Sequence, residues 1–279
     1  MPSVNPPNTS NQLLVSFPSE HVLLLTLNRP KQLNAMTPQL TEDLRKVLNW
    51  FEEEPSLWVV IVTGAGRVFC AGADLKAWNN DQQQGVVTEQ EGVATNPYGF
   101  GSISRRQSRK PFIAAVAGGA YGGGLEMVLN CDYVIASEDA KFALPEVKRG
   151  VIAIQGGIPR LSQIAGHQLA SELLLLGKTI SADEAHRRFG FVNQVVPGSD
   201  SVLRAAAAVA EQMNLNSPDA VQATKRALVL AQEFGHSEML TNHVWGPESK
   251  RTYRGENIKE GLRAFAEKRT PRWTSPAKL

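Results

Sequence analysis

Three short stretches of the chain combine small residues with a carboxylate close by. They are Ala71–Asp74, Gly122–Glu126 and Leu144–Glu146. Glycine permits left-handed backbone and lets a ligand come close to the main chain. Glycines placed directly before a helix leave backbone N–H groups pointing outward, where they can hold a developing negative charge. These stretches therefore predict backbone donors and acid–base groups in one site.

The glycine-rich stretch Ala117–Glu126 also has a purely structural interpretation, a tight strand-to-helix turn with Glu126 on the surface. Its spacing matches neither G-x-G-x-x-G nor G-x-x-x-x-G-K-[ST]. The turn is therefore neither a dinucleotide fingerprint nor a phosphate loop. The choice between a functional and a structural role stays open on composition alone.

Alternating strands and helices are expected to position these stretches. Apolar runs predict strands, and amphipathic spacing after Thr37-Pro38 predicts a helix, with Thr37 as its N-cap. After residue 198 the pattern is helical throughout. We therefore expect an α/β core over 13–198, a helical region over 199–270 and an exposed tail over 271–279. We also expect residues 1–12 to be disordered and 79–97 to form a long polar loop. The expected strands are 21–27, 58–63, 112–116, 132–136 and 192–196.

Composition excludes several classes of protein. A chain of 279 residues with 42% hydrophobic content can bury a large core. A net charge of +2 without a basic run gives no reason to expect nucleic-acid binding. The two cysteines form no C-x-x-C, and the five histidines have no ligand spacing, so we expect no metal site. No apolar stretch reaches membrane-spanning length, and the polar N-terminus is not typical of a signal peptide.

Four stretches of the chain, in their residues and in the distances between them along the sequence, resemble the enoyl-CoA hydratase/isomerase (crotonase) family. They are Leu25–Met36, Phe69–Lys76, Gly118–Glu126 and Leu144–Gly150. The resemblance covers nearly the whole chain. It implies a spiral of repeated ββα units and C-terminal helices that form trimers or dimers of trimers. It also implies an acyl thioester of coenzyme A as substrate, with no separate cofactor.

The resemblance also implies roles for single residues. The family's two oxyanion N–H donors correspond to Ala73 and Gly123, and its two catalytic carboxylates to Glu126 and Glu146. In hydratases of the family the residue at Glu146 exchanges the C2 proton, and the one at Glu126 activates water. Asp74 has an alternative role, as the cap of the helix that follows it. The basic candidates Lys31 and Lys268 have the alternative of being only solvated, as single basic residues often are. The further substrate-binding candidates are Ala71, Asp74, Leu75, Lys31 and Lys268.

The resemblance therefore predicts hydration of a 2-enoyl-CoA or the reverse dehydration. A Δ3-Δ2-enoyl-CoA isomerase needs only the carboxylate at Glu146 and is the first alternative; a non-catalytic acyl-CoA or RNA-binding relative is the second. No G-x-S-x-G is present, which argues against a serine hydrolase. Many hydratases have Pro-Gly where this chain has Ala153-Ile154, and Gln155 is expected near the acyl end. This difference bears on the acyl group and leaves the reaction class unchanged.

The chain ends in Ala277-Lys278-Leu279, a close variant of the Ser-Lys-Leu peroxisomal address. We therefore expect a peroxisomal location, through an import receptor, if the source is eukaryotic, and a cytoplasmic one otherwise. A chance tripeptide is the alternative.

Overall fold

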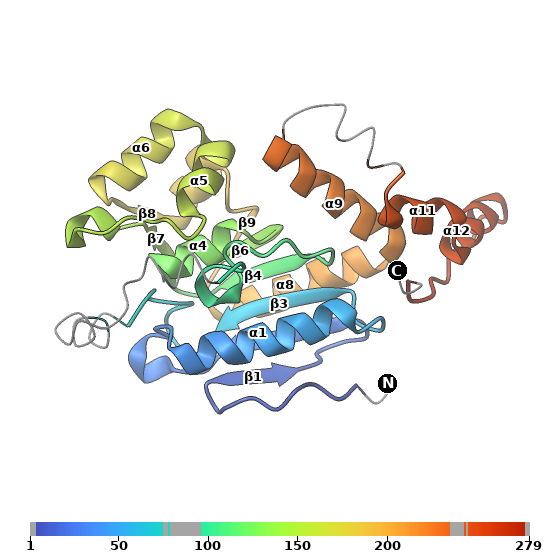
Figure 1. Ribbon diagram of the computed structural model, residues 1–279, viewed down its shortest axis with the longest axis horizontal. Coiled ribbons are helices and arrows are strands. Elements are labelled where there is room, and N and C mark those ends of the chain that lie inside the picture. The colour runs from blue at the N-terminus through green and yellow to red at the C-terminus, as the bar shows by residue number, and fades with distance from the viewer. Residues whose placement is uncertain (1–3, 75–77, 79–95, 235–242, 244, 277–279) are drawn as a thin grey trace.

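The computed structural model describes residues 4–74, 78, 96–234, 243 and 245–276. Its larger sheet has six strands in the order β1-β2-β3-β4-β6-β9, shown in Figure 1. β1 is antiparallel to β2, and all the other neighbours are parallel. The strands are β1 (Leu13–Ser16), β2 (Val22–Leu27), β3 (Val59–Gly64), β4 (Phe112–Val116), β6 (Tyr133–Ser137) and β9 (Gln194–Val196).

A second sheet of three strands has the order β5-β7-β8. These strands are β5 (Gly119–Tyr121), β7 (Lys141–Ala143) and β8 (Thr179–Ser181). The chain passes from β4 in the larger sheet to β5 in the smaller one and then into helix α4 (Gly123–Leu129). It repeats the step from β6 to β7. This repetition is the expected spiral of ββα units.

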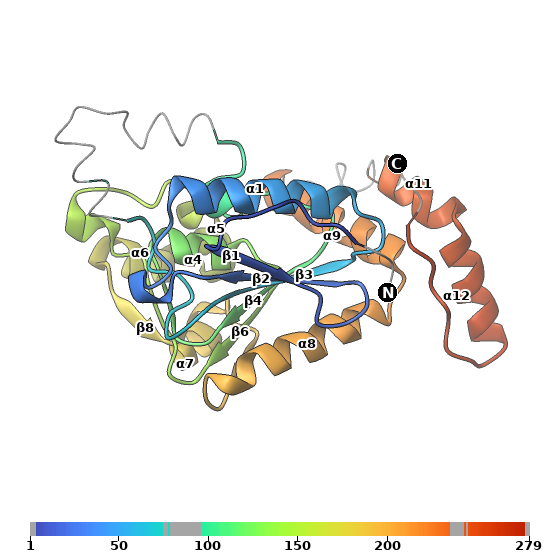
Figure 2. The same ribbon diagram turned by 90° about the horizontal axis from the view of Figure 1, so that it is seen from below.

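Both faces of the larger sheet are covered by helices (Figure 2). Helix α1 (Pro38–Glu53) lies on one face, and α8 (Asp200–Asn214) lies on the other. The Thr37 hydroxyl accepts a hydrogen bond from Leu40 N at 3.1 Å, which confirms the predicted start of α1. Because parallel strands are buried on both faces, they appear in the sequence as continuous apolar runs.

Further helices follow in the second half of the chain. The long helix α9 is contacted by α11. Helices α11 and α12 project from the body (Figures 1 and 2). The helices of this half, apart from α8, are α5 (Gly157–Ala165), α6 (His167–Leu176), α7 (Ala182–Glu184), α9 (Pro218–Phe234), α11 (Pro247–Arg254) and α12 (Glu256–Ala266). Within the residues described, no helix is long and apolar enough to cross a membrane.

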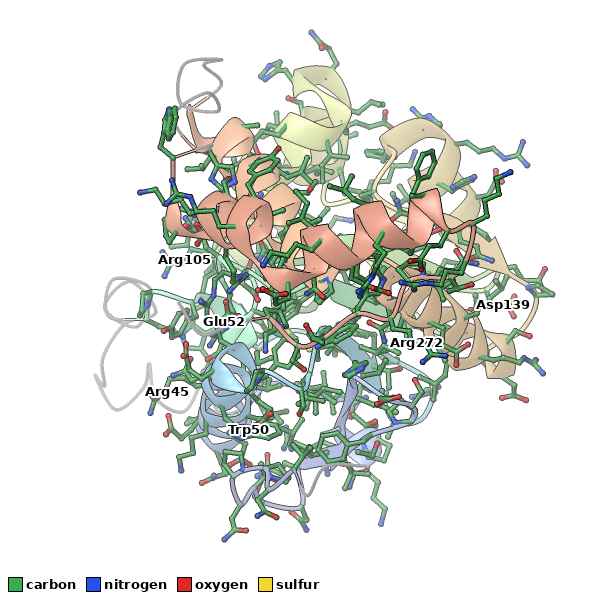
Figure 3. The ribbon with its side chains drawn as sticks, turned by 90° about the vertical axis from the view of Figure 1, so that its right-hand side faces the viewer. Arg45, Trp50, Glu52, Arg105, Asp139 and Arg272 are labelled. Carbon is green, nitrogen blue, oxygen red and sulfur yellow. The ribbon has the colours of Figure 1, made fainter. Side chains whose placement is uncertain are left out.

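Two expectations about the termini need correction. Residues 4–12 are held against the body, because Ser10 N donates to Asp43 and Asn28 N donates to the Gln12 carbonyl. Residues 271–276 do not hang free: Trp273 Nε1 donates to Leu215 O at 2.8 Å, and Pro276 is buried. Figure 3 shows Arg272 on this returning segment. Residues 277–279 lie outside the described part of the chain.

One buried ammonium joins α9 to the sheet. Lys225 Nζ donates to Lys110 O at 2.8 Å and to Asp132 Oδ2 at 2.6 Å. We expect Lys225→Met to lower the free energy of unfolding by about 1–3 kcal/mol, because two hydrogen bonds from a buried ammonium are lost. Urea unfolding measures this loss. The control is Arg226→Met on the same helix, where the side chain makes one 3.3 Å bond, to Gln107, among the described residues. Equal stability of the two variants would contradict the expectation.

Candidate active site

The glycine turn begins α4 abruptly. Gly122 has φ 54° and ψ −130°, a conformation that favours glycine. Its N–H donates to Ala143 O at 2.9 Å, and its carbonyl accepts from Leu125 N and Glu126 N. All seven residues of α4 are buried. The turn therefore anchors the N-terminus of α4 to the smaller sheet.

The structure brings the two predicted oxyanion donors, Ala73 and Gly123, into neighbouring stretches of backbone. Ala73 pairs with Met36 in an isolated β-bridge. A Cβ atom on Gly72, which has φ +90°, would lie 2.9 Å from Tyr121 O and 3.4 Å from Gly123 N. Only a glycine at 72 allows this close approach.

Cys70 lies directly before this stretch and is not a candidate nucleophile. Its side chain is buried, and Gly72 N donates to its Sγ at 3.4 Å. Burial raises the pKa of the Cys70 thiol to about 12, so the thiol is neutral at physiological pH. Its bridge to Ala120 aligns the Ala71–Asp74 stretch with β5.

Glu126 sits on α4 with 3% of its surface exposed. Its Oε1 accepts hydrogen bonds from Gln155 N and Gly157 N, each at 2.9 Å. A Cβ on Gly157 would lie 3.1 Å from the same oxygen, so a larger residue there would press on the carboxylate. The segment that departs from the Pro-Gly of many hydratases therefore holds the Glu126 carboxylate through its backbone.

Glu146 opens a short 3-10 helix, Glu146–Arg149, directly after β7 and Leu144-Pro145. Its Oε1 would lie 3.3 Å from a Cβ on Gly122, so the carboxylate faces the glycine turn. Glu126 N is bonded to the carbonyl of the same Gly122. The two glutamates that were predicted from sequence thus border one turn.

Three further substrate-binding candidates, Ala71, Asp74 and Leu75, precede or follow the proposed oxyanion donor Ala73 in the sequence. Ala71 N donates to Leu33 O at 3.0 Å, and the next residue, Gly72, lies against Tyr121 O of the glycine turn. The Asp74 carboxylate lies 3.8 Å from Arg29 Nη2, and the main-chain carbonyl of Asp74 accepts from Trp78 N at 2.9 Å. Leu75 lies outside the described residues.

The two candidate lysines lie apart from one another. Lys31 is exposed in the short helix Pro30–Gln32. Lys268 is exposed and follows α12, a helix that projects from the body well away from α4 (Figure 1). A single chain therefore does not bring Lys268 to the turn. Within the described ranges, no group of three or more His, Cys, Asp and Glu side chains is placed to hold a metal ion.

A cavity of about 270 Å³ adjoins Glu146, between the 3-10 helix and helices α5 and α6. Most of its lining is apolar, so it can take an apolar group. The lining side chains are Leu144, Glu146, Val147, Ile152, Ala153, Ile158, Ser162, His167, Ala170, Ser171, Leu174 and Leu175.

Sequence comparison agrees with this geometry. The profile of a family described as enoyl-CoA hydratase/isomerase matches residues 18–276. A mevalonyl-coenzyme A hydratase of Aspergillus fumigatus is 44% identical over 266 residues, which are 95% of this chain and 96% of that protein. A probable enoyl-CoA hydratase of Mycobacterium bovis is 36% identical, over 91% of this chain and 95% of its own.

Solved structures give the same result. The enoyl-CoA hydratase EchA1 of Mycobacterium marinum superposes with a TM-score of 0.84 at 36% identity, covering 95% of this chain and 99% of that one. Fold and site define a crotonase-type protein. The chain belongs to the enoyl-CoA hydratase/isomerase family.

Proposed function

We propose that this protein adds water across the double bond of a 2-enoyl-CoA, or catalyses the reverse dehydration. The observation that carries the proposal is the glycine turn, which Glu126 and Glu146 border and beside which Ala73 lies. Attack of water on C3 moves the π electrons toward the thioester oxygen. Backbone N–H groups of Ala73 and Gly123 would stabilise that charge, and losing one such donor costs roughly 10²–10³ in rate.

The two carboxylates divide the proton transfers. Glu126 would take a proton from water as the oxygen bonds to C3, and Glu146 would deliver a proton to C2 as the enolate collapses. Each such group contributes about 10²–10⁴-fold. The bonds from Gln155 N and Gly157 N support the assignment of Glu126, because they hold its carboxylate in one orientation.

For the acyl group we propose mevalonyl-CoA as the first substrate to test. Two fungal relatives named mevalonyl-coenzyme A hydratase are each 44% identical to this chain, and that name supports a 3-methyl acyl group that carries hydroxyls. Ala153-Ile154 distinguishes this chain from the Pro-Gly of many hydratases and adjoins Glu126 through Gln155. Dehydration of mevalonyl-CoA would give a 3-methyl-2-enoyl thioester.

The test is a panel of acyl-CoA thioesters scored by kcat/KM. It includes mevalonyl-CoA, a straight-chain 3-hydroxyacyl-CoA, a short 2-enoyl-CoA and a 3-enoyl-CoA. Water addition or loss supports the hydratase assignment. Conversion of the 3-enoyl thioester without any addition of water would establish the isomerase instead, and no turnover of any thioester would support a non-catalytic relative.

We also propose that the protein assembles as a trimer or a dimer of trimers. The apolar face of α8 packs partly within the subunit, since Val202, Ala206 and Ala210 join the core. Other apolar side chains remain exposed to solvent: Leu228 on α9 is 59% exposed, and Phe265 on α12 is 86% exposed. These surfaces support contact between subunits, which could also bring Lys268 of one chain to another's site. Sedimentation at micromolar concentration that gave only monomer would refute this.

For location, the proposal rests on the C-terminal tripeptide at 277–279. The last dozen residues fused to a fluorescent reporter should direct it to peroxisomes in a eukaryotic cell. A diffuse cytosolic signal would refute the peroxisomal address.

A further inference from the structure

The segment from Gly99 to Arg106 runs beside α4 and contacts the candidate site from a side that the proposed mechanism does not use. Asn130, at the end of α4, donates from Nδ2 to Ile103 O at 2.6 Å and to Arg106 O at 2.9 Å. The Phe100 ring covers Gly123, since a Cβ on Gly123 would lie 2.5 Å from it. One end of the segment therefore touches a proposed oxyanion donor.

Ser104 lies at the centre of this segment and is completely buried. Its Oγ accepts a hydrogen bond from Phe100 N at 2.8 Å and donates one to Gln155 O. The Ser104 carbonyl lies against Gly156, where a Cβ would come within 2.6 Å of it. A hydroxyl both donates and accepts, so the Ser104 side chain joins its own segment to the backbone at Gln155.

The same Gln155 donates its N–H to Glu126 Oε1. A continuous series of contacts therefore runs from the ring over Gly123 through Ser104 to the carboxylate of Glu126. Ser104 itself does not touch that carboxylate. We propose that Ser104 is a positioning residue: it fixes Gln155 so that the Glu126 carboxylate keeps the orientation that deprotonates water. This rests on the proposed function, because it takes Glu126 as the group that activates water.

The alternative is that the bond from Ser104 Oγ to Gln155 O contributes only to the stability of the fold. Such a bond is typically worth about 0.5–1.5 kcal/mol, and losing it would affect every activity of the folded enzyme equally. The positioning role differs, because it acts on Glu126 and leaves Glu146 alone. Glu146 belongs to a different segment, the short 3-10 helix after β7.

Two reactions separate the roles. The first is hydration of a 2-enoyl-CoA, which needs both glutamates. The second is exchange of the C2 protons of a saturated acyl-CoA with solvent deuterium. This reaction adds no water to the substrate. Ser104→Ala should lower kcat for hydration by roughly 10–100-fold, the scale of a misplacement of about 1 Å, while KM and the exchange rate stay within about 2-fold. Ser104→Cys keeps the size and a weak donor and should fall between Ser104→Ala and the unmodified enzyme.

Ser102 supplies a matched control. It is equally buried, two residues away, and its hydroxyl donates to Thr41 O at 3.2 Å in helix α1. Ser102→Ala should lose similar stability, measured by thermal unfolding, and keep hydration within about 2-fold, because no bond from Ser102 Oγ to Gln155 exists among the described residues.

Three results would overturn the proposal: undiminished hydration by Ser104→Ala, equal losses of hydration and exchange, or an equal loss of hydration in Ser102→Ala. If Ser104→Ala does not fold, Ser104→Cys carries the same comparison. Failure of the proposed function is recognised separately, because the unmodified enzyme would then add no water to any 2-enoyl-CoA.

Discussion

Glu126→Gln should lower kcat for hydration by about 10²–10⁴, since the amide cannot accept a proton from the attacking water. Binding of the thioester should change only a few-fold, because the proposed oxyanion donors are backbone groups of Ala73 and Gly123. The glutamine carbonyl oxygen can still accept from Gln155 N and Gly157 N, so we expect the local fold to persist. Loss of the ultraviolet absorbance of a short 2-enoyl-CoA measures the rate.

The control for this substitution is Glu138→Gln, an exposed glutamate after β6 whose Oε1 accepts only a 3.3 Å bond from Gly198 N among the described contacts. It should hydrate at the unmodified rate. Exchange of the C2 proton should survive in Glu126→Gln, since that step needs no water. Full hydratase activity in Glu126→Gln would remove the proposed role and favour the isomerase.

The strands of the larger sheet were largely predictable, because burial on both faces requires apolar side chains at every position. Val22–Leu27, Val59–Gly64 and Phe112–Val116 are therefore apolar except at Thr26, Thr63 and Gly64. β1 was missed: its apolar run is only Leu13 to Val15, and only Leu13 of the strand is fully buried. β5 was taken for part of a turn, because Gly119–Tyr121 becomes a strand only through pairing with β7.

The candidate site follows the same division. Short motifs predicted Glu126 at the start of a helix, since glycines and a carboxylate have local meaning, whereas Glu146 was expected in an extended segment and opens a 3-10 helix instead. The bond from Gln155 N to Glu126 joins residues 29 apart, and that from Ser104 Oγ to Gln155 O joins residues 51 apart. No local pattern encodes such contacts, which arise from packing α4 against α5 and the segment after residue 96. Gln155 was expected near the acyl end, and the role of its main-chain groups could not be predicted.

Glu146→Gln should abolish both reactions. It removes the group that exchanges the proton at C2, and neither hydration nor deuterium exchange into a saturated acyl-CoA can proceed without that transfer. We expect each rate to fall by about 10²–10⁴. Mass spectrometry of the thioester after incubation in deuterium oxide measures exchange, and the absorbance assay measures hydration. Glu138→Gln again serves as the surface control. Retained exchange in Glu146→Gln would contradict the assignment, since Glu126 would then be acting at C2.

The double variant tests whether the two glutamates act as one unit. If they serve one water and one substrate carbon in a single addition, the second substitution removes little that the first has left. Glu126→Gln combined with Glu146→Gln should therefore lose far less than the product of the two single losses. The physical reason is their common position at Gly122, whose carbonyl is bonded to Glu126 N and whose Cα side faces Glu146 Oε1. Strict multiplication of the two losses would instead mean that the glutamates act in independent steps.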